Sequence, residues 1–382
     1  MAGFLHIISF DVPYPADYGG VVDVFYKLRA LHREGVKIIL HCYEYGRGNP
    51  PELHKYCERI HYYPRNLGIF RSLSSLPYIV NSRNGSELLN RLQEDKYPIL
   101  FEGLHSCYYL QHPALEDRVK IVRTHNVEHH YYKALADSVN GLFKKGYFLL
   151  EASRLKSFEA VLSSASGIAA ISMGDAAHFS SLHNRVHCIP AFHPFEKVVL
   201  SKRTGDYALY HGNLGVPEND RAAKYLVSEV MPHTKCQLII AGSNPSAELI
   251  RLASRDPRIS LRAGIDTQTL HLLVAEAAVN ILPTFQATGI KLKLLAALFT
   301  GKHCIVNTPM VKATGLEDLC LIADDAIEMA HALDNCIKQE FSQEALAKRQ
   351  IILEEKFSNR AGALNLMKLA GIRLGETLLT DI

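Results

Sequence analysis

Short apolar runs alternate with segments of helical spacing along most of the 382-residue chain. The first apolar run covers residues 5–10, and residues 21–32 then have the spacing of an amphipathic helix. Strands that alternate with helices in this way predict an α/β fold with parallel, doubly wound sheets. The other apolar runs that predict strands lie at residues 36–42, 59–63, 98–101, 120–123, 167–172, 186–189, 208–210, 237–241, 259–261, 279–282 and 304–306.

The alternation occurs in two series, which predicts two domains. A chain of 382 residues is too long for one ordinary hydrophobic core. Between the series, residues 191–207 form an aperiodic segment that mixes Pro, Lys and Gly, and we interpret it as a linker. We therefore expect two Rossmann-like domains at residues 1–195 and 196–360, followed by a helical tail at residues 361–382.

The C-terminal segment, residues 342–379, has helical spacing and no further strand. Its apolar side chains need a surface on which they can be buried. We therefore expect part of this segment to pack back onto the first domain. The side chains behind this expectation are Ile351, Ile352, Leu353 and Phe357.

The segment from residue 281 to 301 has the pattern of a strand, a turn and a helix. Thr288 is expected to cap this helix, and the free N–H groups of a helix start suit an anion such as phosphate. Lys291 and Lys293 lie in the expected first turn, where a bound anion would offset their repulsion by the helix dipole. On a helix these lysines would diverge by about 200°, so they are not expected to contact the same phosphate. The alternative is that both lysines are solvated.

Other expected strands are followed by glycine or polar residues at the edge where doubly wound sheets bind ligands. Gly19 and Gly20 lie in such a loop and would let the backbone approach a ligand, although a tight turn explains them equally well. His105 follows the strand at residues 98–101. The strand at residues 120–123 is followed by His125, Asn126, Glu128, His129 and His130.

The spacing of these histidines differs from the H-E-x-x-H pattern of a zinc helix. His129 and His130 face different sides of the expected helix, so at most one of them can join His125 in a site. The alternatives are that the histidines are structural and that Asn126 caps the helix. Because no D-x-D pair follows a strand, we expect no metal ion.

Composition excludes several classes of protein. The net charge of +3, without a basic stripe, argues against a nucleic-acid partner. The eight cysteines form no C-x-x-C pair, which is typical of buried thiols in a reducing cytoplasm. We expect neither a signal peptide nor a membrane span. The expected helix at residues 141–164 begins with LFKKGYFLL and either faces a core or lies on the inner face of a membrane.

Four segments, in order along the chain, resemble motifs of bacterial nucleotide-sugar glycosyltransferases of family 4, which have the two-domain GT-B fold. They are PYPADYGG, THNVEHHYY, HGNLGVPEN and GIKLKLLAALFTGKHCIVN. The resemblance runs over most of the chain. It implies a cleft between the domains, with the acceptor held by the first domain and the donor by the second.

The resemblance also implies roles for individual residues. His125 and Glu128 are the expected catalytic residues, with His125 near the transferred sugar as hydrogen-bond partner or proton shuttle. Lys293 aligns with the more regular lysine of the motif and is expected nearer the donor diphosphate than Lys291. The acceptor side is assigned Tyr18, His105 and Asn126, and the donor side Gly19, Gly20, Gly212, Asn213, Thr288, Gly289, Ile290, Lys291 and Lys293.

The function implied by the resemblance is a retaining hexosyltransferase of cell-surface polysaccharide synthesis. Its partners would be a nucleotide-diphosphate sugar as co-substrate and a glycan or lipid-linked acceptor, with no metal or other cofactor. One departure is that Thr288 and Ala296 occupy the positions of two family glutamates. The alternatives are a non-catalytic sugar-nucleotide or glycan-binding homologue and a sugar-nucleotide 2-epimerase, which would need carboxylates in the cleft.

Overall fold

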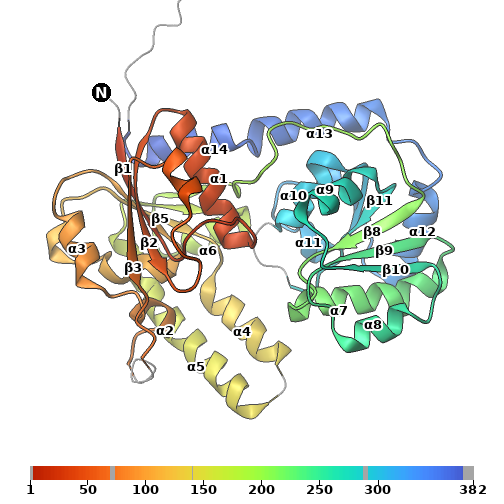
Figure 1. Ribbon diagram of the computed structural model, residues 1–382, viewed down its shortest axis with the longest axis horizontal. Helices are drawn as coiled ribbons and strands as arrows, with labels where there is room; N and C mark the ends of the chain where they lie inside the picture. The colour runs from red at the N-terminus through yellow and green to blue at the C-terminus, as the bar shows by residue number, and fades with distance from the viewer. Residues whose placement is uncertain (1–2, 69–73, 140, 287–290, 373–382) are drawn as a thin grey trace, which may run out of the picture. The chain divides into compact units, whose positions relative to one another are not determined.

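Two compact units make up the computed structural model, which describes residues 3–68, 74–139, 141–286 and 291–372 (Figure 1). Unit 1 comprises Met1–Pro194 together with Phe357–Ile382, and unit 2 comprises Phe195–Lys356. The expected divisions after residues 195 and 360 differ from these bounds by one residue and by four residues.

Unit 1 contains a seven-stranded parallel sheet with the order β3-β2-β1-β4-β5-β6-β7. Helices cover both faces, so neighbouring residues of one strand enter different cores. Ile7 packs with residues of α1 (Gly19–Arg33) and α14 (Asn359–Leu369), whereas Ile8 belongs to the core on the other face. The strands are β1 (Phe4–Ser9), β2 (Lys37–Glu44), β3 (Arg59–Pro64), β4 (Ile99–Glu102), β5 (Lys120–Thr124), β6 (Gly167–Ala170) and β7 (Val186–Cys188).

The C-terminal helix α14 lies against α1 within unit 1 (Figure 1). Asn359 anchors its start, because the side-chain Nδ2 donates to the His193 carbonyl at 2.7 Å and the His193 N–H donates to the Asn359 Oδ1 at 3.0 Å. A Cβ at Gly362 would lie 2.9 Å from the ring of Phe192, so glycine permits this close approach. The other α-helices of unit 1 are α2 (Tyr78–Asn81), α3 (Ser86–Leu92), α4 (Glu128–Ser138), α5 (Leu142–Phe158) and α6 (Met173–Phe179).

Unit 2 contains a six-stranded parallel sheet with the order β10-β9-β8-β11-β12-β13. Its strands are β8 (Tyr207–His211), β9 (Gln237–Gly242), β10 (Ile259–Ala263), β11 (Val279–Ile281), β12 (His303–Val306) and β13 (Leu321–Ile322). Its α-helices are α7 (Pro217–Tyr225), α8 (Ala247–Ala253), α9 (Thr267–Glu276), α10 (Leu292–Thr300), α11 (Thr308–Val311), α12 (Ala326–Cys336) and α13 (Gln343–Lys356).

The predicted fold class, two doubly wound α/β sheets, is confirmed. The pattern did not predict β13, because this edge strand has two residues and both are exposed. The long helix expected at residues 141–164 is two elements, since α5 ends at Phe158 and a 3₁₀ helix covers Glu159–Ser164.

The helix α10 begins later than expected. Lys291 occupies the N-cap position with extended backbone (φ −77°, ψ 119°), and its carbonyl accepts the Leu294 N–H at 2.9 Å. The prediction that Thr288 caps this helix is therefore wrong. The expected donor residues Thr288, Gly289 and Ile290 themselves lie outside the described residues.

The C-terminal segment divides its apolar side chains between the units. In α13, which belongs to unit 2, Leu353 is buried, whereas Ile351 is 58% exposed. The expectation that Ile351 is buried is wrong because it lies on the outer face of its helix. Phe357, by contrast, is buried at the start of the unit 1 portion.

Candidate functional site

The loop after β8 is a tight turn that leads into α7. The Gly212 N–H donates to the Ala241 carbonyl at 3.1 Å, and a Cβ at Gly242 would lie 1.8 Å from the Gly212 carbonyl oxygen. The Asn213 carbonyl accepts a hydrogen bond from Asn219 Nδ2 at 2.9 Å. Gly212 and Asn213, two of the expected donor residues, are therefore held in place by neighbouring backbone and by α7.

Lys293 reaches this loop from α10. Its Nζ donates to Asn219 Oδ1 at 2.8 Å and lies 3.3 Å from the Tyr210 hydroxyl. Burial lowers the pKa of the Lys293 amine to about 8, although the nearby Glu218 acts in the opposite direction. No carboxylate of the described residues forms an ion pair with Lys293, so a phosphate group would supply the missing countercharge.

Lys291 approaches a different residue of α7. Its Nζ lies 3.6 Å from Glu218 Oε1, and Glu218 also accepts a hydrogen bond from the Thr284 hydroxyl. Because Lys291 precedes the helix, the expected divergence of the two lysines does not apply, and both reach α7. Neither Lys291 nor Lys293 is exposed, so the alternative of two solvated lysines is wrong.

His211 ends β8 beside Lys293 and was not predicted as a site residue. Its side chain is buried, and its Nε2 has no hydrogen-bond partner among the described residues. Burial and the charge of Lys293 lower the pKa of His211 to about 3, so its ring is neutral at pH 7. The sequence did carry a signal, because the histidine directly precedes Gly212 at the carboxyl end of a strand.

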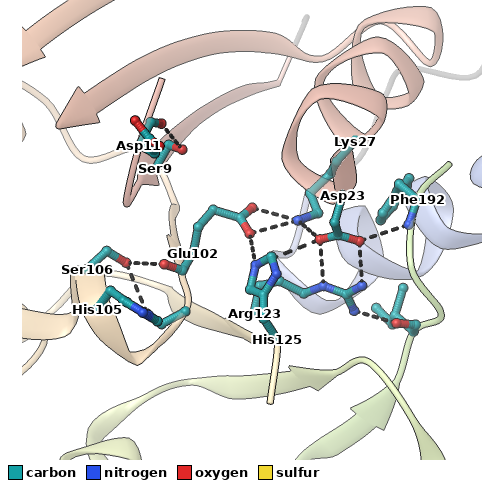
Figure 2. A network of polar contacts seen from close by, with 12 residues as sticks. Ser9, Asp11, Asp23, Lys27, Glu102, His105, Ser106, Arg123, His125 and Phe192 are labelled. Atoms are coloured by element: carbon teal, nitrogen blue, oxygen red, sulfur yellow. Dashed lines mark hydrogen bonds and ion pairs between the residues drawn. The ribbon is translucent and has the colours of Figure 1, made fainter. Parts of the chain in front are cut away.

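In unit 1, four charged side chains and a histidine form a buried network (Figure 2). Lys27 of α1 joins two acids, with its Nζ 2.8 Å from Asp23 Oδ2 and 2.7 Å from Glu102 Oε1. Arg123 of β5 binds Asp23 through two contacts, Nη2–Oδ1 at 2.8 Å and Nε–Oδ2 at 3.2 Å. Apart from His125, two anions and two cations balance in this network, which offsets part of the cost of burying them.

The acids of this network remain ionised. Burial raises the pKa of Glu102, but Lys27 and His125 outweigh it, so the pKa is lowered overall. The pKa of Asp23 is also lowered, because Arg123 and Lys27 outweigh burial. The Phe192 N–H donates to Asp23 Oδ1 at 2.8 Å, which attaches a distant part of the chain to α1.

His125 lies with its Nε2 3.0 Å from Glu102 Oε2 and 3.9 Å from Asp23 Oδ2 (Figure 2). In the neutral imidazole, Nε2 carries the proton that the ionised Glu102 accepts, and Nδ1 is left as an acceptor. The side chain is 9% exposed. An imidazole held in this way can pass on a proton or accept a hydrogen bond from a substrate.

Glu128, the other expected catalytic residue, approaches a different histidine. Its carboxyl is buried at the start of α4, with Oε1 3.9 Å from His105 Nδ1. Burial and two neighbouring carboxylates raise the pKa of Glu128 to about 8. Asn126 lies in the turn before α4 but does not cap it, because Val127 occupies the N-cap position.

His129 belongs to another cluster, with Glu159 and His178. Its Nδ1 lies 3.1 Å from Glu159 Oε1, and His178 Nε2 lies 2.9 Å from Glu159 Oε2. Ligand atoms of the three residues lie within 4.8 Å of one another, so they could hold a metal ion. The sequence did not indicate this set, because its members come from three separate segments.

A cavity of about 550 Å³ opens at the carboxyl ends of the strands in unit 1. Tyr18 and His105, two of the three expected acceptor-side residues, line it, and the Tyr18 hydroxyl donates to Asp11 Oδ2 at 2.6 Å. Asn126 is not part of its wall. The expectation that Gly19 and Gly20 lie in a loop is wrong, because they are the first two residues of α1. A Cβ at Gly20 would meet the ring of Phe10 at 2.7 Å.

Helices α4 and α5 lie side by side and project from the sheet of unit 1 (Figure 1). The first turn of α5 is apolar and uncovered, with Leu142 89% and Phe143 96% exposed. Lys144 and Lys145 follow directly. The described part of the chain contains no helix with the length and apolarity that a membrane crossing requires.

Comparison by sequence with known proteins gives a relative but no family. No family model matches the chain. A Klebsiella pneumoniae protein, called an uncharacterized 44.6 kDa protein in the cps region, is 26% identical over 350 residues, which cover 86% of this chain and 89% of that protein.

Solved structures share the fold at lower sequence identity. HepE from Anabaena, in complex with UDP and glucose, has a TM-score of 0.65 and 12% identity, over 97% of this chain and 100% of HepE. TarM has a TM-score of 0.68 and 9% identity, over 97% of this chain and 99% of TarM, and is a protein of S. aureus. The chain therefore has the GT-B fold of glycosyltransferases, as the sequence motifs implied.

Proposed function

We propose that this protein is a glycosyltransferase that moves a sugar from a nucleotide-diphosphate donor to a glycan or lipid-linked acceptor. HepE was solved with UDP-glucose, and a TarM mutant was solved with UDP and alpha-GlcNAc-glycerol. The cps region of the Klebsiella pneumoniae relative supports a role in the synthesis of a cell-surface polysaccharide. The order of the four motifs supports membership of family 4.

The surroundings of Lys293 carry this proposal. Its amine is buried, makes no ion pair with a carboxylate of the described residues, and lies beside the Gly212–Asn213 turn at the carboxyl end of β8. Ligands of doubly wound sheets bind at such turns. A diphosphate there would receive the charge of Lys293, and the neutral His211 would offer a hydrogen bond. Unit 2 is therefore the proposed donor domain.

In the proposed reaction, the bond between the anomeric carbon and the diphosphate oxygen breaks. The acceptor hydroxyl oxygen forms the new bond to that carbon and gives up its proton. Lys293, with Lys291 in support, stabilises the negative charge that grows on the leaving diphosphate. His125, oriented by Glu102, serves as hydrogen-bond partner or proton shuttle on the side of unit 1.

Family 4 membership implies that the transferred sugar keeps its anomeric configuration. The Glu102–His125 pair favours a second mechanism, in which His125 takes the acceptor proton as a general base and direct displacement inverts the anomeric carbon. The coupling constant of the anomeric proton in the product, measured by NMR, distinguishes the two. An unchanged configuration supports retention, and the opposite configuration supports the general-base mechanism.

A panel of UDP-, GDP- and dTDP-sugars, each with glycan and lipid-linked acceptors, tests the proposed function. The expected result is release of the nucleoside diphosphate together with a glycosylated acceptor, seen by chromatography and mass spectrometry. Conversion of the donor into its 2-epimer would instead identify an epimerase. Binding of a sugar nucleotide without any turnover would identify a non-catalytic homologue.

We also propose that the start of α5 contacts the inner face of a membrane. Exposed Leu142 and Phe143 would enter the lipid, and Lys144 and Lys145 would attract anionic headgroups. The protein should float with phosphatidylglycerol vesicles, and joint replacement of Leu142 and Phe143 by serine should abolish flotation. Leu364→Ser, at an exposed position of α14, is the control. Equal flotation of both variants would refute this contact.

A further inference from the structure

Two arginines of the unit 1 cavity make no ion pair with any described carboxylate. Arg83 is 2% exposed and gives its hydrogen bonds to carbonyls, with Nε and Nη2 on Phe10 and Nη1 on Ile79. Arg65 donates only its Nε, to the Ser82 hydroxyl at 2.9 Å. Its two terminal nitrogens therefore have no hydrogen-bond partner among the described residues. A buried cation without an anion is costly unless a ligand supplies one.

The other charged side chains of the cavity do not compensate the positive charge of Arg65 and Arg83. Among the described residues, its lining holds three guanidinium groups, on Arg47, Arg65 and Arg83, against the single carboxylate of Asp11. The Asp11 carboxylate accepts hydrogen bonds from the Val12 N–H at 2.8 Å and from the Tyr18 hydroxyl at 2.6 Å. Arg47 is paired outside the cavity wall with Asp17, at 2.8 Å. His105 adds no negative charge. The open cavity is therefore electropositive around Arg65 and Arg83.

Aromatic rings lie beside these cations. The guanidinium of Arg65 lies 4.8 Å from the centre of the Tyr45 ring, and that of Arg83 lies 6.0 Å from the same ring. Tyr18 is 41% exposed in the same wall. Aromatic faces pack against the apolar face of a sugar ring, whereas guanidinium groups bind carboxylate or phosphate oxygens in a bidentate fork. The combination suits a sugar that carries an anionic group.

We infer that the acceptor carries a carboxylate or a phosphate, which binds the terminal nitrogens of Arg65 in this cavity, where the buried charge of Arg83 adds to the attraction. That the anionic ligand is the acceptor rests on the proposed function. Binding of an anion in the cavity, by contrast, can be measured without any transfer reaction. A uronic acid would supply a carboxylate, and a phosphorylated sugar or a lipid-linked sugar phosphate would supply a phosphate. The cavity would also select against neutral glycans, because a bound neutral glycan would leave both arginines without an anion.

The test is direct binding to the full chain, measured by NMR titration with three probes. Methyl glucuronide and glucose 1-phosphate are expected to bind, the former reporting carboxylate and the latter phosphate recognition, and neutral methyl glucoside is expected to bind at least about tenfold more weakly. A higher salt concentration should weaken the binding of the two anions and leave the binding of the glucoside unchanged. Preference for one anion over the other identifies which group the acceptor carries.

Arg65→Gln is the variant of choice, because Arg83 is buried and its replacement could unfold the protein. Arg65→Gln should lower the affinity for the anionic probes about tenfold or more. It should leave UDP binding unchanged, since the UDP site is assigned to unit 2. Arg185→Gln, at an exposed position before the other edge strand of the same sheet, is the matched control. Equal binding of charged and neutral probes, or unchanged anion binding in Arg65→Gln, would overturn the inference. If the wild-type protein does not bind UDP, the proposed function is contradicted instead.

Discussion

The Nε2 atom of His125 lies 3.0 Å from Oε2 of Glu102, and Lys27 Nζ lies 2.7 and 2.8 Å from the two oxygens of that carboxylate. The histidine is therefore oriented by an ionised acid that is itself held by a buried lysine. Such an arrangement fixes the tautomer of the imidazole and leaves one nitrogen for a substrate. It also separates two roles, because His125 is partly exposed whereas Glu102 and Lys27 are fully buried.

Replacement of His125 by alanine should lower turnover by roughly 10²-fold or more, while the protein stays folded. The physical reason is that the proton-transfer group is lost without breaking the Lys27–Glu102 ion pair. Steady-state kinetics with the donor found in the sugar-nucleotide panel measures the effect. His187→Ala, at an exposed position of β7, serves as the control and should keep full activity. Near-normal turnover of His125→Ala would make His125 a structural residue.

Glu102→Gln should act differently, mainly on stability. It leaves Lys27 buried with only Asp23 as a charged partner, and breaking a buried ion pair in this way costs about 3–5 kcal/mol. Urea unfolding of Glu102→Gln and of His125→Ala measures the contrast. Equal stability of the two variants would contradict the view that Glu102 belongs to a structural ion network.

UDP binding should be coupled to proton uptake near pH 8. Burial lowers the pKa of Lys293 from 10.5 to about 8, so part of the protein carries a neutral amine at pH 8.5. A bound diphosphate would raise that pKa again, and affinity should fall as the pH rises above 8. Between pH 8 and 10.5 the unfolded chain holds this proton more tightly than the folded protein does. The stability of the free protein should therefore rise as the pH rises through that window.

Calorimetry of UDP binding at pH 8.5, in buffers of different ionisation enthalpy, measures the proton uptake. Lys293→Arg, which stays charged at this pH, should show none. An observed enthalpy that is independent of the buffer in the wild type would mean that Lys293 does not change its protonation on binding.

Gly242→Ala should destabilise the protein by about 3 kcal/mol or more, because the new Cβ would lie 1.8 Å from the Gly212 carbonyl oxygen. Gly146→Ala is a matched control within α5, where a Cβ meets nothing within 4 Å. It should be neutral or stabilising by up to about 1 kcal/mol, since alanine favours a helix. Thermal unfolding of the two variants gives the comparison. A Gly242→Ala protein as stable as the wild type would show that the donor loop is not tightly held.

The sequence predicted the two sheets because short apolar runs alternate with segments of helical spacing along most of the chain. It missed β13, whose two exposed residues carry no such pattern. Capping was harder to predict, because the choice between Thr288 and Lys291 as the start of α10 depends on backbone geometry and not on periodicity.

For the candidate sites, proximity along the chain was a partial guide. It grouped His125 with Glu128, whereas the fold joins His125 to Glu102, and Glu102 in turn to Lys27 of α1. Ion networks of this kind combine residues from several strands and helices, so spacing alone does not reveal them. The same holds for the arginines of the unit 1 cavity, which follow the separate elements β2, β3 and α2.

Transfer activity should survive EDTA. Lys293 and N–H groups are expected to stabilise the diphosphate, and they need no Mg²⁺ for this. The cluster of His129, Glu159 and His178 makes this a sharp test, because it contains suitable ligand atoms. Activity would be measured before and after chelation, with MgCl₂ or MnCl₂ added back. Complete loss on chelation, restored by either ion, would sink the prediction of a metal-independent enzyme.

The most direct test of the donor site is UDP affinity in Lys293→Ala and Lys291→Ala, measured by calorimetry at pH 7. Lys293 is expected to contact the diphosphate, so its loss should cost about 1.5–3 kcal/mol, or roughly 10- to 150-fold in affinity. Lys291 lies 3.6 Å from Glu218, and its loss should cost well under about 1 kcal/mol. Unchanged UDP binding in Lys293→Ala, in a protein that melts like the wild type, would contradict the donor site proposed for unit 2.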